Sequence, residues 1–147
     1  MIKVEKNTKL NIPNLTSMGE MEMRQMYHEN EAWKRLLNFM LDENVLLKYR
    51  LSEIVRYISD PQFLEKAEDF QSRFVKKDIL ISLLRDDVAE IGSLLISKEP
   101  DHSDRIVQIH SRLKKLRNNV AEIEKQFSKL KLDFNRYMSE RIVHQTE

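Results

Sequence analysis

Apolar residues recur at alternating gaps of three and four along the last third of the chain. The positions are Ile106, Ile109, Leu113, Leu116, Val120, Ile123, Phe127, Leu130, Phe134 and Tyr137. A β-strand would repeat every second residue, so this pattern predicts an α-helix with an apolar seam of period about 3.5 residues, as in coiled coils. A helix cannot bury such a seam alone. The rest of the chain, or a second copy, must therefore cover it.

Two earlier stretches, from Met23 to Ile58 and from Phe63 to Leu95, carry seams with the same alternation. Each also has apolar residues outside its seam. In the first stretch these are Leu36, Phe39, Leu41, Val45, Leu46 and Val55, and in the second Ile79, Leu80, Leu83 and Leu94. A helix that is apolar on more than one side usually packs on more than one side.

Local signals divide the chain between these stretches. Ser17 and Glu20 match a capping box, in which each side chain satisfies an unpaired backbone N–H at a helix start. Asp60 can cap the next helix with Pro61 at its first position, where the missing N–H costs nothing. A turn around Pro100 precedes the last stretch. We therefore expect helices at about residues 18–59, 61–97 and 103–143.

The predicted fold is all-α, with three long antiparallel helices in a coiled-coil-like, up-down-up bundle. Similar helix lengths, roughly 55–60 Å at 1.5 Å per residue, and short connections favour this arrangement. Residues 17–147 form the three-helix bundle, and residues 1–16 form a loose polar N-terminal arm. Pro13 favours an extended conformation at Ile12, and chain termini are loose unless they are tied down.

Composition limits the class of protein. A chain of 147 residues with two Gly and three Pro suits one domain of a few long helices. The net charge of +1 provides no global field for nucleic acid or an acidic membrane. No apolar run approaches the roughly 20 residues that span a bilayer, and the N-terminus lacks a signal-peptide core. With no cysteine in the sequence, we expect a soluble cytoplasmic protein that does not bind membranes.

Three polar residues occupy seam positions, namely Asn30, Asn44 and Lys77. A buried Asn in a coiled-coil core can fix register and oligomeric state, because mispaired amides stay unsatisfied. The alternative is that the seam is hydrated there, above all at Asn30 near the helix start. A ligand or metal site inside the bundle is a further hypothesis, but the four histidines lack the Glu-x-x-His pattern of di-iron bundles. We expect no metal and no cofactor.

The one dense basic run comprises Arg112, Lys114, Lys115 and Arg117. Such a stripe can contact phosphates, and these four residues are the candidate contacts for nucleic acid. Acidic residues interrupt the run further along the helix, so a solvated face with ion pairs within the helix is the favoured interpretation.

No nucleophile elbow, glycine-rich loop or paired catalytic residues can be recognised, so we expect a protein that is not an enzyme. The prediction is a helical interaction or scaffold module that acts through coiled-coil surfaces. The partner would be a second copy, with a dimer favoured, or another helical protein. The candidate dimer face is Phe39, Leu46, Leu80 and Leu83; alternatively, a wider core within one chain covers them. Association with nucleic acid is the alternative function.

Overall fold

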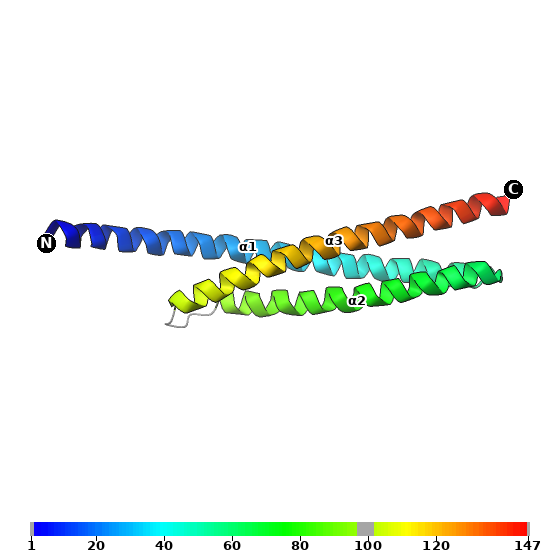
Figure 1. The fold of residues 1–147 in the computed structure, drawn as a ribbon, viewed down its shortest axis with the longest axis horizontal. Helices are drawn as coiled ribbons and strands as arrows, with labels where there is room; N and C mark the ends of the chain where they lie inside the picture. The colour runs from blue at the N-terminus through cyan, green and yellow to red at the C-terminus, as the bar shows by residue number, and fades with distance from the viewer. Residues whose placement is uncertain (1, 97–101, 147) are drawn as a thin grey trace.

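The computed structural model of the chain consists of three helices, α1 (Ile2–Val55), α2 (Pro61–Ile96) and α3 (His102–Thr146) (Figure 1). It describes residues 2–96 and 102–146, with the side chains of residues 19–96 and 106–141. These ranges contain no strand, which confirms the all-α prediction. No helix in the described part of the chain is long and apolar enough to cross a membrane.

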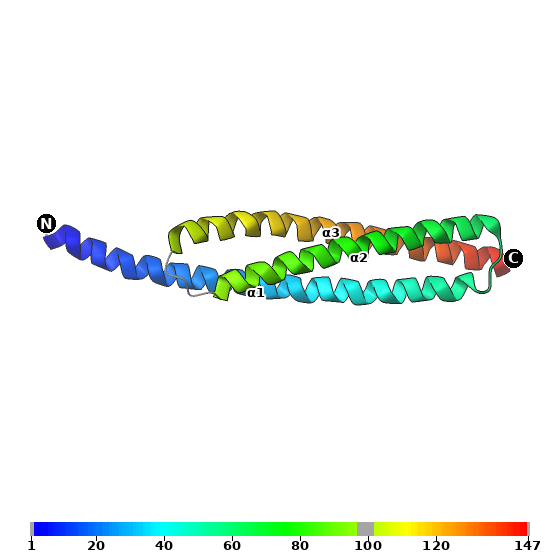
Figure 2. The same cartoon turned by 90° about the horizontal axis from the view of Figure 1, so that it is seen from below.

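The helices α1 and α2 form an antiparallel hairpin. The side-chain amide of Asn30 donates to the carbonyl of Val88 at 3.0 Å, and that of Asn44 donates to the carbonyl of Phe74 at 2.8 Å. A step forward along α1 is therefore a step backward along α2. Figure 2 shows the two helices joined by a short turn at one end of the bundle.

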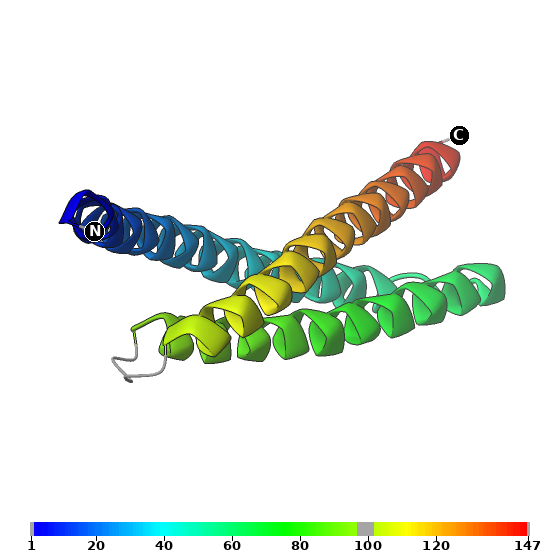
Figure 3. The ribbon, with the colours of Figure 1, turned by 60° about the vertical axis from the view of Figure 1, so that its left-hand side comes forward.

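The helix α3 runs antiparallel to α2. Phe63 near the start of α2 stacks on Tyr137 near the end of α3, with ring centroids 6.2 Å apart. Further along, Lys77 bonds Gln126, so the partner's number falls as the α2 number rises. The topology is the predicted up-down-up order. Figure 3 shows that α3 is inclined to the other two helices rather than strictly parallel to them.

The three seams form one continuous core. The buried apolar residues are Met26, Trp33, Leu37, Met40, Leu47 and Leu51 of α1; Phe63, Ala67, Phe70, Phe74, Ile81, Val88, Ile91 and Leu95 of α2; and Ile109, Leu113, Leu116, Val120, Ile123, Phe127, Leu130, Phe134 and Met138 of α3. Every buried apolar residue except Met138 occupies a predicted seam position, while the seam residues Met23, Ile54, Ile58, Leu84 and Tyr137 are only partly covered.

Three contacts join α1 to α3 at a constant offset of 88 residues. They are Glu22–His110 at 2.9 Å, Glu29–Arg117 at 2.6 Å and Glu43–Lys131 at 2.7 Å. The three glutamates are separated by whole heptads, so they repeat one position of the α1 helix. In a parallel pair of helices, such flanking positions meet across the seam and set the alignment. The helices α1 and α3 are therefore a parallel, in-register pair.

Asp60 ties the end of α3 to the turn between α1 and α2. Its carboxylate accepts the N–H of Gln62 at 3.3 Å, and its carbonyl accepts the N–H of Leu64 at 3.0 Å, which confirms the predicted helix cap. Arg141 of α3 forms an ion pair with the same carboxylate. The hydrogen bond from Arg141 holds the pKa of Asp60 below its ordinary value.

The bounds of the first helix were predicted wrongly. The helix α1 begins at Ile2, well before the expected start at residue 18, and ends at Val55, before residue 59. Ser17 is therefore not a cap, and Pro13 lies inside the helix. Proline lacks an N–H and costs about 3 kcal/mol inside a helix, but its φ angle is compatible with helical backbone, and the residues on both sides of Pro13 continue the helix once it is nucleated. Residues 2–16 continue α1 beyond the end of the bundle (Figures 1 and 2). The mobility of this segment stays a prediction.

Gly92 lets α1 and α2 approach closely. A Cβ atom at this position would lie 2.9 Å from Nδ2 of Asn30. That is closer than a carbon and a nitrogen pack without a shift, and Nδ2 is the atom that donates to the carbonyl of Val88. Asn30 and Gly92 therefore form a matched pair across the hairpin.

We expect Gly92→Ala to destabilise the protein by about 1–2 kcal/mol, because the loss of the buried Asn30 bond outweighs the better helix propensity of Ala. Urea unfolding followed by circular dichroism measures this change. In an Asn30→Ala background the same substitution should become neutral or stabilising, by up to about 1 kcal/mol. Equal effects of Gly92→Ala in both backgrounds would show that the close contact with Asn30 has no energetic role.

Candidate functional site

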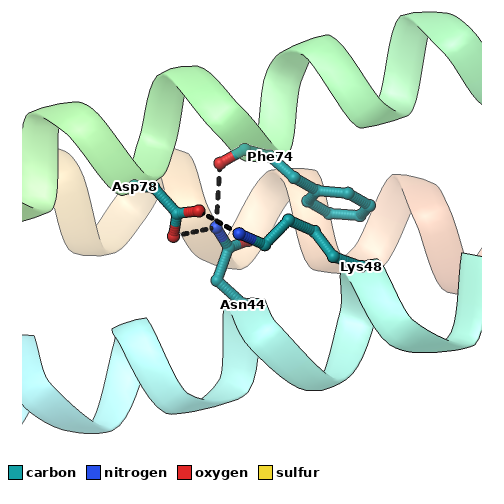
Figure 4. Close-up of polar contacts among 4 residues, drawn as sticks. All are labelled: Asn44, Lys48, Phe74 and Asp78. Atoms are coloured by element: carbon teal, nitrogen blue, oxygen red, sulfur yellow. Dashed lines mark hydrogen bonds and ion pairs between the residues drawn. The ribbon is translucent and has the colours of Figure 1, made fainter.

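Asn44 lies at the centre of a polar network between α1 and α2 (Figure 4). Its side chain is fully buried. Nδ2 donates to the carbonyl of Phe74 at 2.8 Å and to Oδ1 of Asp78 at 2.6 Å. Lys48, one turn further along α1, pairs with the other oxygen of Asp78. The network therefore joins one turn of α1 to one turn of α2.

This network distinguishes the observed register from its neighbours. Gln71 and Arg85 stand one heptad before and after Asp78 on α2. If α1 slid by seven residues, Lys48 would face an amide or a like charge instead of a carboxylate. Asn44 would also lose a bond to a charged acceptor, and such bonds contribute about 1.5–3 kcal/mol. The geometry favours a register role for Asn44.

Asn30 repeats the same contact two heptads earlier. It is 1% exposed, so the seam is not hydrated at this position. Both Asn30 and Asn44 donate to backbone carbonyls of α2, and the Oδ1 atom of each is buried without a hydrogen-bond partner in the described structure. An unpaired buried acceptor costs about 1–3 kcal/mol. Each amide therefore lowers the stability of the fold while its donor bond aligns α1 with α2.

Lys77 is the third polar seam residue. It lies on the flank of α2 that faces α3, whereas Asn30 and Asn44 contact the flank that faces α1. Its ammonium donates to Oε1 of Gln126 at 2.7 Å, and Gln126 donates to Glu122 at 3.1 Å. Partial burial lowers the pKa of Lys77 from its ordinary value of 10.5, and the nearby charge of Arg73 lowers it further. Glu122 opposes this shift. No anionic side chain bonds Lys77 directly among the described residues.

A surface pocket of about 220 Å³ opens beside Lys77, in the groove between α2 and α3. We call it the lysine pocket. It is lined by Arg73, Lys76, Lys77, Gln126, Lys129 and Leu130. Four of the six lining residues carry a positive charge. Sequence reasoning noted Lys77 but missed the pocket, because the other cations meet only when α2 and α3 pack in this register.

The predicted dimer residues of α1 are exposed. Phe39 is 58% exposed and Leu46 is 63% exposed, so the core of a single chain does not cover them. They lie one turn before and one turn after Glu43, which bonds Lys131 of α3. Both side chains therefore border the groove between α1 and α3.

The predicted dimer residues of α2 border a different groove. Leu80 is 44% exposed and Leu83 is 57% exposed. Leu80 lies two turns after Arg73, on the same side of α2, and Arg73 contacts Asp133 of α3 at 3.3 Å. The helix α3 thus runs between the two pairs of predicted residues. The structure does not bring these four residues onto one flat face.

Other exposed apolar residues connect the two pairs around the side of the hairpin opposite α3. Val45 and Val75 each lie three residues before a member of the Lys48–Asp78 ion pair, and they are 58% and 41% exposed. We call the combined surface the hairpin patch. It comprises Phe39, Val45, Leu46 and Tyr49 of α1 and Val75, Ile79, Leu80 and Leu83 of α2. By contrast, Leu36, Leu41, Val55 and Leu94 pack partly against the core.

Two of the four residues of the basic run of α3 form ion pairs with other helices of the bundle. Arg112 pairs with Glu90 of α2 at 3.2 Å, and Arg117 pairs with Glu29 of α1. The structure shows these ion pairs between helices, where the sequence predicted them within one helix. Lys114 and Lys115 are exposed. Phosphate binding by the run stays a prediction, and the two ion pairs weaken it because they neutralise two of the four charges.

No group of three or more His, Asp or Glu side chains that could hold a metal ion occurs among the described residues. Comparison of the chain with protein-family models, with curated proteins and with solved structures found no match. The surfaces and polar networks of this chain are therefore the observations on which a function can be argued.

We expect Asn44→Leu to raise the free energy of unfolding by about 1 kcal/mol, since it removes an unsatisfied buried acceptor, adds apolar contacts in the seam and leaves Asp78 paired with Lys48. The same change should broaden the distribution of oligomers, which sedimentation velocity measures. Leu47→Met, an apolar exchange at the next seam position, is the control and should leave the distribution unchanged. A single species for Asn44→Leu would rule out the register role.

Lys77→Met should raise stability at neutral pH by an amount on the order of 1 kcal/mol, because an apolar side chain replaces a partly buried charge. The advantage should shrink as the pH approaches 10.5, the ordinary pKa of lysine. At a pH between the lowered pKa of Lys77 in the folded protein and 10.5, Lys77 has lost its proton in the folded protein but keeps it in the unfolded chain. Unfolding then takes up a proton, so the free energy of unfolding of the wild type rises with pH. Urea titrations of both proteins between pH 7 and about 10.5 test this. If the difference in free energy of unfolding between the two proteins did not change with pH, the charge of Lys77 would not be its cause.

Proposed function

We propose that this chain is a non-enzymatic helical interaction module that assembles with a second copy of itself through the hairpin patch. The observation that carries the proposal is the patch itself, in which eight large apolar side chains are each more than 40% exposed. Single exposed apolar residues are ordinary on protein surfaces. Eight of them within about two turns of one level of the hairpin are instead typical of an interaction site.

The two halves of the patch lie at the same level of the bundle. Asn44 and Lys48 of α1 contact Phe74 and Asp78 of α2, and the exposed apolar residues lie within about two turns of these contacts. The patch is therefore compact along the helix axis. It includes Phe39 and Tyr49, and aromatic side chains often dominate the energetics of interfaces.

A second copy is a partner that fits this surface. In a two-fold symmetric interface each patch meets the same patch, which is the commonest arrangement among soluble homo-oligomers. The Lys48–Asp78 ion pair lies within the patch and is about one quarter exposed. Across a two-fold axis, Lys48 of one copy can face Asp78 of the other. Another helical protein with an apolar face is the alternative partner.

We place this module in the cytoplasm, because a chain of 147 residues without cysteine suits a reducing compartment. In this role the bundle needs no catalytic group. Its helices hold the patch rigid, and the projecting start of α1 extends the module at one end (Figure 2).

We expect the wild-type chain to sediment as a dimer at micromolar concentration, and the double variant Leu46→Glu with Leu83→Glu to sediment as a monomer. Burying two unpaired carboxylates per chain would cost several kcal/mol, a large part of the roughly 8 kcal/mol that holds a dimer of micromolar affinity. Circular dichroism should show unchanged helix content, because both positions are exposed in the single chain.

Leu132→Glu is the matched control, since Leu132 is 58% exposed but lies on α3 outside the patch. It should remain dimeric. A wild-type chain that is monomeric at about 100 μM, a concentration well above that at which specific dimers form, would overturn self-association. A control that dissociates as readily as the double variant would show that the patch is not the interface.

A further inference from the structure

We propose that the lysine pocket binds a small, multiply charged oxyanion of the phosphate class, such as a pyrophosphate group. Three lysines and one arginine line the same surface pocket of about 220 Å³. The proposal concerns a site on α2 and α3, and it is independent of the self-association proposed above.

The first observation is the position of Lys77. This lysine occupies a seam position where the other helix residues are apolar, and its one direct partner among the described residues is the neutral amide of Gln126. A partly buried charge is costly unless it is paired. An anion in the pocket would supply the missing negative charge next to the ammonium.

The second observation is the convergence of charge from two helices. Arg73, Lys76 and Lys77 come from α2, and Lys129 comes from α3. Arg73 contacts Asp69 at 3.7 Å and Asp133 at 3.3 Å, and these two contacts fix its guanidinium. These carboxylates offset the charge of Arg73, so Lys76, Lys77 and Lys129 supply the charge for an anion, and Arg73 can contribute one of its five N–H donors.

The third observation limits the size of the ligand. The carboxylates of Asp69, Glu122 and Asp133 lie next to the cationic side chains, because each contacts Arg73 or Gln126. A long polyanion that crossed the pocket along the groove would meet this negative charge. A compact anion can instead contact Lys76, Lys77 and Lys129 without crossing all three carboxylates, with Leu130 and Gln126 completing the lining. The geometry therefore favours a small phosphate compound over a nucleic acid strand.

The test is isothermal titration calorimetry, in which sodium pyrophosphate is titrated into the full chain at low ionic strength to measure stoichiometry and affinity. We expect one pyrophosphate per chain and an affinity that falls as salt is added. Lys77→Met should weaken binding at least tenfold, and Lys76→Gln with Lys129→Gln should weaken it similarly. Pyrophosphate should also raise the melting temperature of the wild-type protein but not that of Lys77→Met.

The control is Lys114→Gln with Lys125→Gln, which removes two exposed charges of α3 outside the pocket. It should keep wild-type binding. Because Lys77→Met is expected to be more stable than the wild type, its loss of binding cannot be attributed to unfolding. The site would be overturned if Lys77→Met bound pyrophosphate as tightly as the wild type does. It would also be overturned if the control variant lost as much affinity as the pocket variants. Binding of heparin that pyrophosphate does not displace would also overturn it, since the surface would then be a general polyanion face.

Discussion

The fold depends on one constraint, which is that three apolar seams must be buried and none of the helices can bury its own. The seams meet in a single core in which Phe74 of α2 and Phe134 of α3 pack edge to face, with centroids 5.2 Å apart. Apolar packing of this kind is strong but not directional. A seam of repeating leucine, phenylalanine and isoleucine would tolerate a slide by one heptad. Other interactions must therefore choose the register.

Polar residues make this choice, and they do so differently on the two sides of α1. Against α2, buried amides such as Asn44 bond the backbone and a carboxylate inside the seam. Against α3, glutamates at whole-heptad intervals meet basic side chains at the edge of the seam. Exposed ion pairs contribute about 0–1 kcal/mol each, so the α3 contacts align the helix more than they stabilise it. A slide that breaks the buried contacts is the costlier change, because it leaves the buried amide in place without a partner.

The sequence pattern predicted the three seams, the topology and the cap at Asp60, since each of these follows from the spacing of residues along one helix. It predicted the start of α1 wrongly, because the local signals at Pro13 and Ser17 compete with the extension of a helix that is already formed. The lysine pocket and the grouping of exposed apolar residues could not be predicted. Both depend on which flank of one helix meets which flank of another. The heptad spacing of Glu29 and Glu43 was a signal that could have revealed the pairing of α1 with α3.

The alignment of α1 with α3 within one chain is the central claim, because it closes the three-helix bundle and defines the groove between these two helices. Glu43→Cys with Lys131→Cys in this cysteine-free chain provides the most direct measurement, using a short bismaleimide cross-linker and mass analysis under denaturing conditions. The control pair is Glu43→Cys with Lys114→Cys, which lies about 25 Å further away along α3. The account predicts an efficient cross-link within one chain for the first pair and none for the control. A first pair that cross-links only between chains, or not at all, would contradict it.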